Sequence, residues 1–235
     1  MAIAEAKGTV WFLTTNHGRG VFAQSIDSSL DPPTRPIPLV RKVGIAWIGR
    51  PGDVVQLEAG GNALWIGDTI DSKVFRLDLS SRRVTPYQIA GDLDDIAFGD
   101  GYLWVMDGVT ASVTRIDPRG GKPKTLSVSQ LDTLTSITFG GGYVWATDNS
   151  ANEVWRISKD LNSPTPIAVG IAPRDVTYAD GVVWVANYGD GTVSVVNPRI
   201  PSLTRSIPVA VHPRAVAVAD GKVWAVGDAY TINNE

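Results

Sequence analysis

The chain of 235 residues contains no cysteine, which excludes disulfide bonds and thiol chemistry and leaves its compartment open. Its formal net charge is only −3, which disfavours a nucleic-acid partner because nucleic-acid-binding domains are usually strongly basic. No apolar run approaches the ~20 residues of a membrane-spanning helix, so no transmembrane segment is expected. Residues 1–7 lack a basic region followed by an apolar one, and we therefore expect no signal peptide.

The sequence is rich in glycine (24) and tryptophan (8), and five of the tryptophans recur in one short phrase. The phrase is a Gly or Asn, two further residues and a tryptophan. Its tryptophans are 39, 41, 39 and 40 residues apart: Trp65, Trp104, Trp145, Trp184 and Trp224. A period of ~40 residues with four short strands per repeat is typical of propeller blades. We therefore predict an all-β fold, a β-propeller of about six blades of four-stranded antiparallel sheets.

Turn residues and alternating apolar residues place four strands, A to D, in each repeat. In the fifth repeat they are expected at about 174–178, 182–187, 192–197 and 204–209. The prediction is one domain, 1–235, with blades at roughly 2–48, 53–89, 94–128, 134–169, 174–209 and 214–235. The sixth blade is incomplete, with strand B and at most a fragment of strand C after strand A. An open sheet edge favours association, so either the chain belongs to a longer protein or this edge pairs with a partner, including a second copy.

The first repeat is longer than the others, because Trp11 and Trp65 are 54 residues apart. The surplus includes residues 31–38, which contain four prolines and cannot form a central strand. The sequence predicts an extended loop here, followed by a displaced outer strand near 39–48.

Two columns of residues accompany the tryptophans. A polar residue stands three positions after the tryptophan, at Asp68, Asp107, Asp148 and Asn187. A ring of carboxylates could hold a cation, but Asp and Asn also bond the backbone of their own turn, and we favour that interpretation. Hairpin register places an arginine opposite three of the tryptophans, in the pairs Trp65–Arg76, Trp104–Arg115 and Trp145–Arg156, while Trp184 faces Val195. Cross-strand packing with a cation–π contribution explains these pairs better than an anion site.

Three aspartates stand near the starts of A strands, at Asp53, Asp95 and Asp175, whereas Ser136 and Ala215 occupy the other two positions. Carboxylates at a channel mouth could bind Ca²⁺ or Mg²⁺. The alternative is that each carboxylate ties its loop to the neighbouring blade. We expect no cofactor, with Mg or Ca as the alternative.

Loops between strands B and C and between strands D and A emerge on one face of a propeller. The candidate ligand-binding residues on this face are His17, Arg19, Arg174, His212 and Arg214. If the ring closes at six blades, the first and sixth blades are neighbours and both histidines share the face. A catalytic His17–His212 pair is an alternative, since histidine acts as a general base or metal ligand, but no third group is placed to orient either one.

Residues 173–187, PRDVTYADGVVWVAN, and residues 191–198, GTVSVVNP, closely resemble the YVTN-type β-propeller repeat. The resemblance extends from residue 53 onward and, more weakly, over residues 2–27. It implies a propeller fold and a binding or sensor role, because such repeats are often attached to bacterial kinases, regulators or cell-surface proteins. An extracytoplasmic domain of a larger bacterial protein is therefore one expectation, although the localisation is unknown.

Among enzymes, the chain looks nearest to the streptogramin lyases, which are propellers that use histidines and a glutamate with Mg²⁺. This sequence departs from them, since it has two histidines and the order His212-Pro213 in place of Pro-His. Lactonase-type propellers need several acidic and Asn ligands, which the three aspartates match only loosely. No catalytic residue can therefore be carried across.

These observations favour a non-catalytic binding, sensor or protein-interaction module for a protein, peptide or small-molecule ligand. One alternative is a metal-assisted lyase or hydrolase, streptogramin lyase-like or lactonase-like. The other is a structural assembly module that pairs through the incomplete sixth blade.

Overall fold

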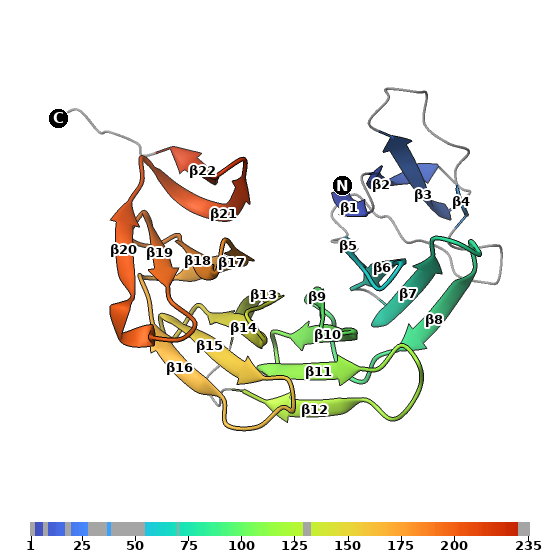
Figure 1. Ribbon diagram of the computed structural model, residues 1–235, viewed down its shortest axis with the longest axis horizontal. Coiled ribbons are helices and arrows are strands. Elements are labelled where there is room, and N and C mark those ends of the chain that lie inside the picture. Colours follow the sequence, from blue (N-terminus) through green and yellow to red (C-terminus); the bar gives the residue numbers. More distant parts are fainter. Residues whose placement is uncertain are drawn as a thin grey trace. The chain divides into compact units, whose positions relative to one another are not determined.

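The computed structural model describes residues 3–6, 9–16, 20–27, 37–38, 55–69, 71–128 and 133–229, and its regular structure is almost entirely β-strand (Figure 1). In these ranges the one helical element is the three-residue 3₁₀ turn η1 (Pro201–Leu203). The chain forms two compact units, residues 1–101 and 102–235. The prediction of an all-β fold is confirmed.

The first unit contains two four-stranded antiparallel sheets whose strands follow sequence order. One sheet consists of β1 (Ile3–Ala6), β2 (Thr9–Asn16), β3 (Gly20–Asp27) and β4 (Ile37–Pro38). The other consists of β5 (Val55–Gly60), β6 (Ala63–Asp68), β7 (Lys73–Asp78) and β8 (Val84–Gln88). Strand β9 (Asp95–Gly99) ends the unit, and both β1 and β9 lie against β5.

The second unit is also built from antiparallel sheets whose strands follow sequence order. Its strands β10 (Tyr102–Asp107), β11 (Ser112–Ile116) and β12 (Lys124–Ser127) pair in order. Two four-stranded sheets follow: β13 (Leu134–Gly140), β14 (Tyr143–Asp148), β15 (Glu153–Ser158) and β16 (Thr165–Ala168); then β17 (Pro173–Ala179), β18 (Val182–Asn187), β19 (Thr192–Val196) and β20 (Arg205–Pro208). A two-stranded sheet of β21 (Val211–Ala219) and β22 (Lys222–Ala229) ends the description. The first strands of successive sheets are neighbours, β13 beside β17 and β17 beside β21 (Figure 1).

The strands predicted for the fifth repeat correspond to β17–β20, with boundaries that differ by at most about one residue. In the first sheet, β4 pairs with β3 within the proline-rich stretch, where the sequence predicted a loop. The outer strand predicted near 39–48 lies outside the described residues and stays a prediction. Proline is tolerated in β4 because this is an edge strand and needs to pair on one side only. The number of blades and the closure of a ring stay predictions, as does the single domain 1–235.

The recurring tryptophans form the core between sheets. Trp65, Trp104 and Trp145 have no exposed surface. Trp65 stacks on Phe98 with 5.7 Å between ring centroids, and Trp104 stacks on Phe139 at 5.9 Å. Each phenylalanine belongs to the first strand of the following sheet, so the tryptophan of one repeat is buried by the next repeat. Burial of such large aromatic surfaces is a main source of stability in a sheet protein.

The predicted roles of the polar column are confirmed at its three aspartates. The Oδ1 atoms of Asp68, Asp107 and Asp148 accept hydrogen bonds from backbone N–H groups two or three residues later, in their own hairpins. Asn187 differs, because its side-chain amide donates to the hydroxyls of Thr192 and Ser194 on the next strand. The column therefore holds hairpins together rather than forming a cation site.

The predicted Trp–Arg register is confirmed, but the cation–π partner was wrong in two of the three pairs. Arg76 lies over Trp65 at 5.7 Å, as expected. Arg115 instead lies over Tyr102 at 4.5 Å, and Arg156 over Tyr143 at 5.0 Å. In these two repeats a tyrosine stands two residues before the tryptophan, on the same side of the strand, and the arginine stacks on it, whereas the repeat of Trp65 has Ala63 at that position.

Candidate functional site: an arginine and tyrosine surface

In the second unit, two loops and three strands bring polar side chains together. The hairpin after β18 is joined to the connection before β17, because the N–H groups of Tyr188 and Gly189 donate to the carbonyls of Ala172 and Ile171 at 3.0 and 2.8 Å. The carboxylate of Asp190 in turn accepts from the N–H of Ile171 at 2.9 Å. These bonds fix Tyr188 at the end of the sheet where β17 and β21 begin.

Two β-bulges set the positions of the arginines. Pairing of β17 with β18 shifts register between Pro173 and Asp175, and pairing of β21 with β22 shifts between Pro213 and Ala215. Arg174 and Arg214 are the extra residues at these two bulges. A bulge redirects the side chain of its extra residue, and bulges are over-represented beside functional sites.

Both redirected arginines lie over one aromatic ring. The guanidinium carbons of Arg174 and Arg214 are 4.4 and 4.9 Å from the centroid of the Tyr188 ring. Each cation–π contact of this kind contributes about 0.5–1 kcal/mol of stability at an exposed site. Here the two contacts keep two positively charged groups beside the same ring. The site lies where β17 and β21 begin and where β22 ends, three strands that are labelled in Figure 1.

Asp228, at the end of β22, is the acidic residue of the site. It accepts from Nε and Nη2 of Arg214, the shortest distance being 2.7 Å, and from the hydroxyl of Tyr188 at 2.9 Å. The hydrogen bonds from Arg214 and Tyr188 lower the pKa of Asp228, and the same carboxylate raises the pKa of Arg214. The charge of Arg214 is therefore largely balanced within the protein.

Arg174 has no such balance. It is exposed, and none of the described residues gives its guanidinium a hydrogen bond or an ion pair. Its one described side-chain interaction is the contact with the ring of Tyr188. None of the five hydrogen-bond donors of this guanidinium is used by the part of the chain that the structure describes.

His212 packs against Tyr188, and its pairing with His17, which lies outside the described residues, stays a prediction. Its ring centroid is 5.4 Å from that of Tyr188, and Nδ1 is 2.7 Å from the carbonyl oxygen of Tyr188. Because a carbonyl oxygen can only accept, Nδ1 is the donor, which fixes the tautomer of a neutral ring. The imidazole thus buttresses the loop that presents Tyr188.

An exposed apolar side chain borders the charged residues. Ile171, whose N–H and carbonyl bond to the Tyr188 hairpin, is 56% exposed. Tyrosine, arginine and an exposed aliphatic residue on one rigid surface are the composition of many interface hot spots. We call Ile171, Arg174, Tyr188, His212 and Arg214 the Tyr188 surface.

Sequence reasoning selected three members of this surface, missed Tyr188 and Ile171, and also missed the neighbouring Asp228. The pair Pro-Arg recurs at 173–174 and 213–214, which was a usable signal that two arginines stand at equivalent positions of successive repeats. Tyr188 could also have been found, since the other repeats have Thr69, Gly108 and Asn149 at its position. His17 and Arg19 lie outside the described residues, so their relation to this surface stays a prediction.

The three aspartates predicted as candidate metal ligands have to be described one by one, since only two of them are among the described residues. Asp175 connects three sheets: its Oδ1 accepts from the hydroxyl of Ser136 at 3.0 Å, and its Oδ2 accepts from the N–H of Val216 at 2.8 Å. Burial raises the pKa of Asp175, and these hydrogen bonds lower it only in part. Asp95 accepts from the N–H of Ile96 at 2.9 Å, and Asp53 lies outside the described residues. In the described ranges no three His, Cys, Asp or Glu side chains are grouped in a way that could hold a metal ion.

Across the described part of the chain, no helix has both the length and the apolar character needed to span a bilayer.

No family model and no curated protein sequence matches the chain. Solved structures do match it. A streptogramin B lyase superposes with a TM-score of 0.76 at 16% identity, over 95% of this chain and 74% of that one. A catalytically inactive virginiamycin B lyase from Staphylococcus aureus with quinupristin gives 0.74 at 16% identity, over 96% and 76%. A nidogen/laminin complex gives 0.67 at 13% identity, over 94% and 86%. At these identities the likeness establishes a propeller-like fold, shared by an enzyme and by a protein-binding domain, and nothing finer.

Proposed function

We propose that this chain is a non-catalytic binding module and that the Tyr188 surface binds an acidic segment of a protein partner. The observation on which this rests is the exposed guanidinium of Arg174, which lies 4.4 Å from the ring centroid of Tyr188 and lacks any carboxylate partner among the described residues. A carboxylate of a ligand would supply bidentate, charge-assisted hydrogen bonds to it.

An extended peptide suits this surface better than a small molecule. Its residues belong to loops and strand ends of the second unit, and none of them lines the cavity found between the sheets of that unit. Exposed Ile171 adds an apolar contact beside the cations, as peptide-binding surfaces require. The protein-binding nidogen/laminin neighbour makes the same use of this fold plausible by analogy.

The proposal is tested by fluorescence anisotropy with a labelled oligoglutamate peptide, and with an oligolysine peptide of equal length as the charge control. We expect oligoglutamate alone to bind, and Arg174→Ala to weaken its binding about fivefold, since one exposed charge-assisted contact is worth about 1 kcal/mol. The matched control is Arg205→Ala, which removes an equal charge from exposed β20 in the same unit. Unchanged affinity in the double variant Arg174→Ala/Arg214→Ala would sink this assignment.

A metal-assisted lyase or hydrolase is the second candidate, and the streptogramin B lyase fold neighbour favours it. It would use His212 together with His17, with Mg or Ca bound by Asp53, Asp95 or Asp175. The discriminating measurement is a thermal melt in EDTA followed by addition of Mg²⁺, Ca²⁺ or Mn²⁺. A ligand that binds the native state raises its stability, so a metal-dependent rise in Tm would favour this candidate.

A further inference from the structure

A cavity of about 570 Å³ lies between two neighbouring sheets of the second unit. It opens at the ends of the strands opposite to the Tyr188 surface, where β13 turns into β14 and where the segment after β19 begins. Its walls come from the sheets β13–β16 and β17–β20 and include Gly141, Tyr143, Arg156, Tyr178, Asn197 and Arg199. A volume of this size falls within the usual range of small-molecule sites.

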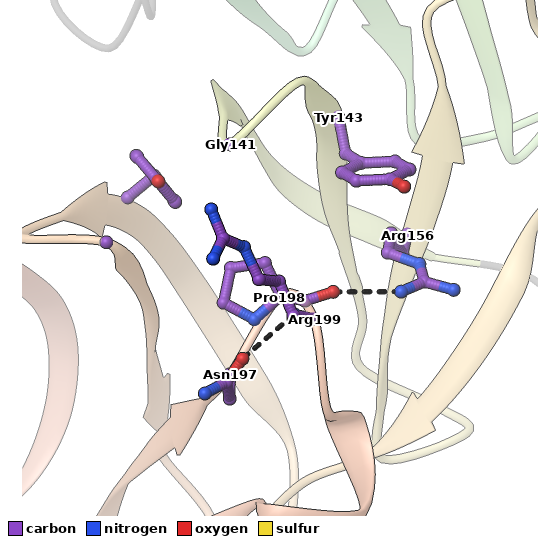
Figure 2. A pocket seen from close by; sticks show the side chains of 8 residues that line it. Gly141, Tyr143, Arg156, Asn197, Pro198 and Arg199 are labelled. Atoms are coloured by element: carbon purple, nitrogen blue, oxygen red, sulfur yellow. Dashed lines mark hydrogen bonds between the residues drawn. The ribbon is translucent and has the colours of Figure 1, made fainter.

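One arginine of the cavity is held in place. Arg156 donates from Nη1 to the carbonyl oxygen of Pro198 at 2.9 Å, which is the dashed line at the right of Figure 2, and its guanidinium lies 5.0 Å from the Tyr143 ring centroid. The hydrogen bond crosses from one sheet to the next. This arginine therefore presents a fixed positive charge to the cavity.

The second arginine, Arg199, has no comparable anchor among the described residues. Arg199 is exposed, and its guanidinium forms no hydrogen bond or ion pair with any described residue. In Figure 2 the guanidinium groups of Arg156 and Arg199 lie on different sides of Pro198. The backbone N–H of Arg199 donates to Oδ1 of Asn197 at 2.9 Å, so the side-chain group that Asn197 can still offer is its NH₂ donor.

The remaining lining residues add ring faces and no negative charge. No Asp or Glu lines the cavity, and the hydroxyls of Tyr143 and Tyr178 have no hydrogen-bond partner in the described part of the chain. Tyr178 is fixed, because its ring fills the space that a side chain at Gly140 would need. The cavity thus combines two cations, several free donors and two aromatic rings.

We propose that this cavity binds a small organic molecule that carries one oxyanion on a sugar-like or other compact ring. The oxyanion, a carboxylate, sulfate or phosphate, would bind the guanidinium of Arg199, and Arg156 adds a second positive charge to the lining of the same cavity. The ring would contact the tyrosine side chains, which offer apolar faces with a polar tip. This site is independent of the acidic-peptide proposal, because it shares no residue with the Tyr188 surface.

Isothermal titration calorimetry tests the proposal with glucuronate, glucose 6-phosphate and glucose as probes. We expect the two acidic sugars to bind and neutral glucose not to bind, and the tighter of the two acids identifies carboxylate or phosphate as the preferred group. Arg199→Ala should weaken binding of the acidic sugars about tenfold, as expected for the loss of a charge-assisted contact in a partly enclosed site.

Two control variants test whether the loss of binding is specific to the charge of Arg199. Arg199→Lys keeps the charge and should retain part of the affinity, while Arg205→Ala removes the same charge outside the cavity and should change nothing. Because the guanidinium of Arg199 forms no hydrogen bond or ion pair with a described residue, the fold should tolerate these changes, and a thermal melt of each variant checks this. Equal binding of glucose and glucuronate, no binding of either acid, or full affinity in Arg199→Ala would overturn the proposal.

Discussion

Carboxyl groups in this protein differ sharply in their surroundings, and the difference is visible residue by residue. Asp228 is exposed and bound by an arginine and a tyrosine, which lower its pKa. Glu58 on β5 is partly buried within the first unit, and this burial raises its pKa to about 7. A hydrogen bond from the backbone N–H of Phe98 favours the charged form and offsets part of the rise. Asp175 is used as a connector between sheets. The three carboxyl groups therefore differ in their partners, in their burial and in the direction of their pKa shifts.

The first prediction concerns Glu58. The pKa of Glu58 is about 7 in the folded protein and 4.5 in the unfolded chain. Between these two pH values the folded protein therefore keeps a proton on Glu58 that the unfolded chain has lost. The free energy of unfolding should then fall as pH rises from about 4.5 to about 7, by up to about 3 kcal/mol, and be flat above that range. Urea unfolding of the wild type and of Glu58→Gln across this range measures the effect. The variant should lose this dependence, and parallel curves for the two proteins would contradict the assignment.

The second prediction concerns Asp175. Replacing it with Ala removes the acceptor for the N–H of Val216 and for the hydroxyl of Ser136, and should lower the free energy of unfolding by about 2 kcal/mol. Asp175→Asn keeps one acceptor oxygen and should cost less. Chemical denaturation of both variants tests this order, and an alanine variant as stable as the wild type would show that the connection between sheets is not needed.

At the scale of the strand, contact between sheets depends on glycines as much as on aromatic rings. A Cβ atom built on Gly60 would lie 2.0 Å from the ring of Phe98, and one built on Gly140 would lie 2.0 Å from the ring of Tyr178. In both places the first strand of the next sheet brings an aromatic ring onto bare backbone. The same glycines accept hydrogen bonds through their carbonyls from the indole N–H groups of Trp65 and Trp145.

We therefore expect Gly140→Ala to destabilise the second unit by about 2 kcal/mol through overpacking. The additional change Tyr178→Ala removes the ring that causes the clash. The double variant should consequently be less destabilised than the sum of the two single variants, and a double-mutant cycle by thermal or urea unfolding provides the coupling energy. Strict additivity would mean that the glycine is needed for some reason other than this contact.

The strands could be predicted because each repeat has its own turn residues and a tryptophan at the same position. A strand boundary that was uncertain in one repeat could therefore be placed by comparison with the others. The outer strand of the first sheet had no such support, since its proline-rich segment has no counterpart in the other repeats. The Tyr188 surface was half predictable. Arg174, His212 and Arg214 could be assigned to one face from strand order alone, whereas the stacking of both arginines on Tyr188 depends on two bulges that the sequence pattern does not specify.

The last sheet of the described chain, formed by β21 and β22, exposes several apolar side chains. Trp224 on β22 is 56% exposed, whereas Trp65, Trp104 and Trp145 are fully buried, and Val223 and Val226 are 39% and 67% exposed. Within the described residues β22 pairs with β21 alone. An apolar strand with one open edge is a surface on which further strands can pair.

If the assembly alternative is correct, this edge should cause self-association that rises with protein concentration. Val226→Lys should then shift sedimentation velocity profiles toward the monomer, because a charged residue on an edge strand opposes pairing. Arg205→Lys on β20 is the control. A wild-type protein that stays monomeric at all concentrations would count against the assembly role and leave the Tyr188 surface as the better-supported site of interaction.

The most direct test of the central claim, that the Tyr188 surface binds acidic peptide, is a nuclear magnetic resonance titration of isotope-labelled protein with oligoglutamate. We expect the largest shifts at the side-chain Nε–H of Arg174 and at the backbone amides of Tyr188 and Ile171, with little change around the cavity near Arg199. These shifts should weaken as salt is added, because exposed charge pairs are screened. Shifts centred on any other surface, or none at saturating peptide, would contradict the account.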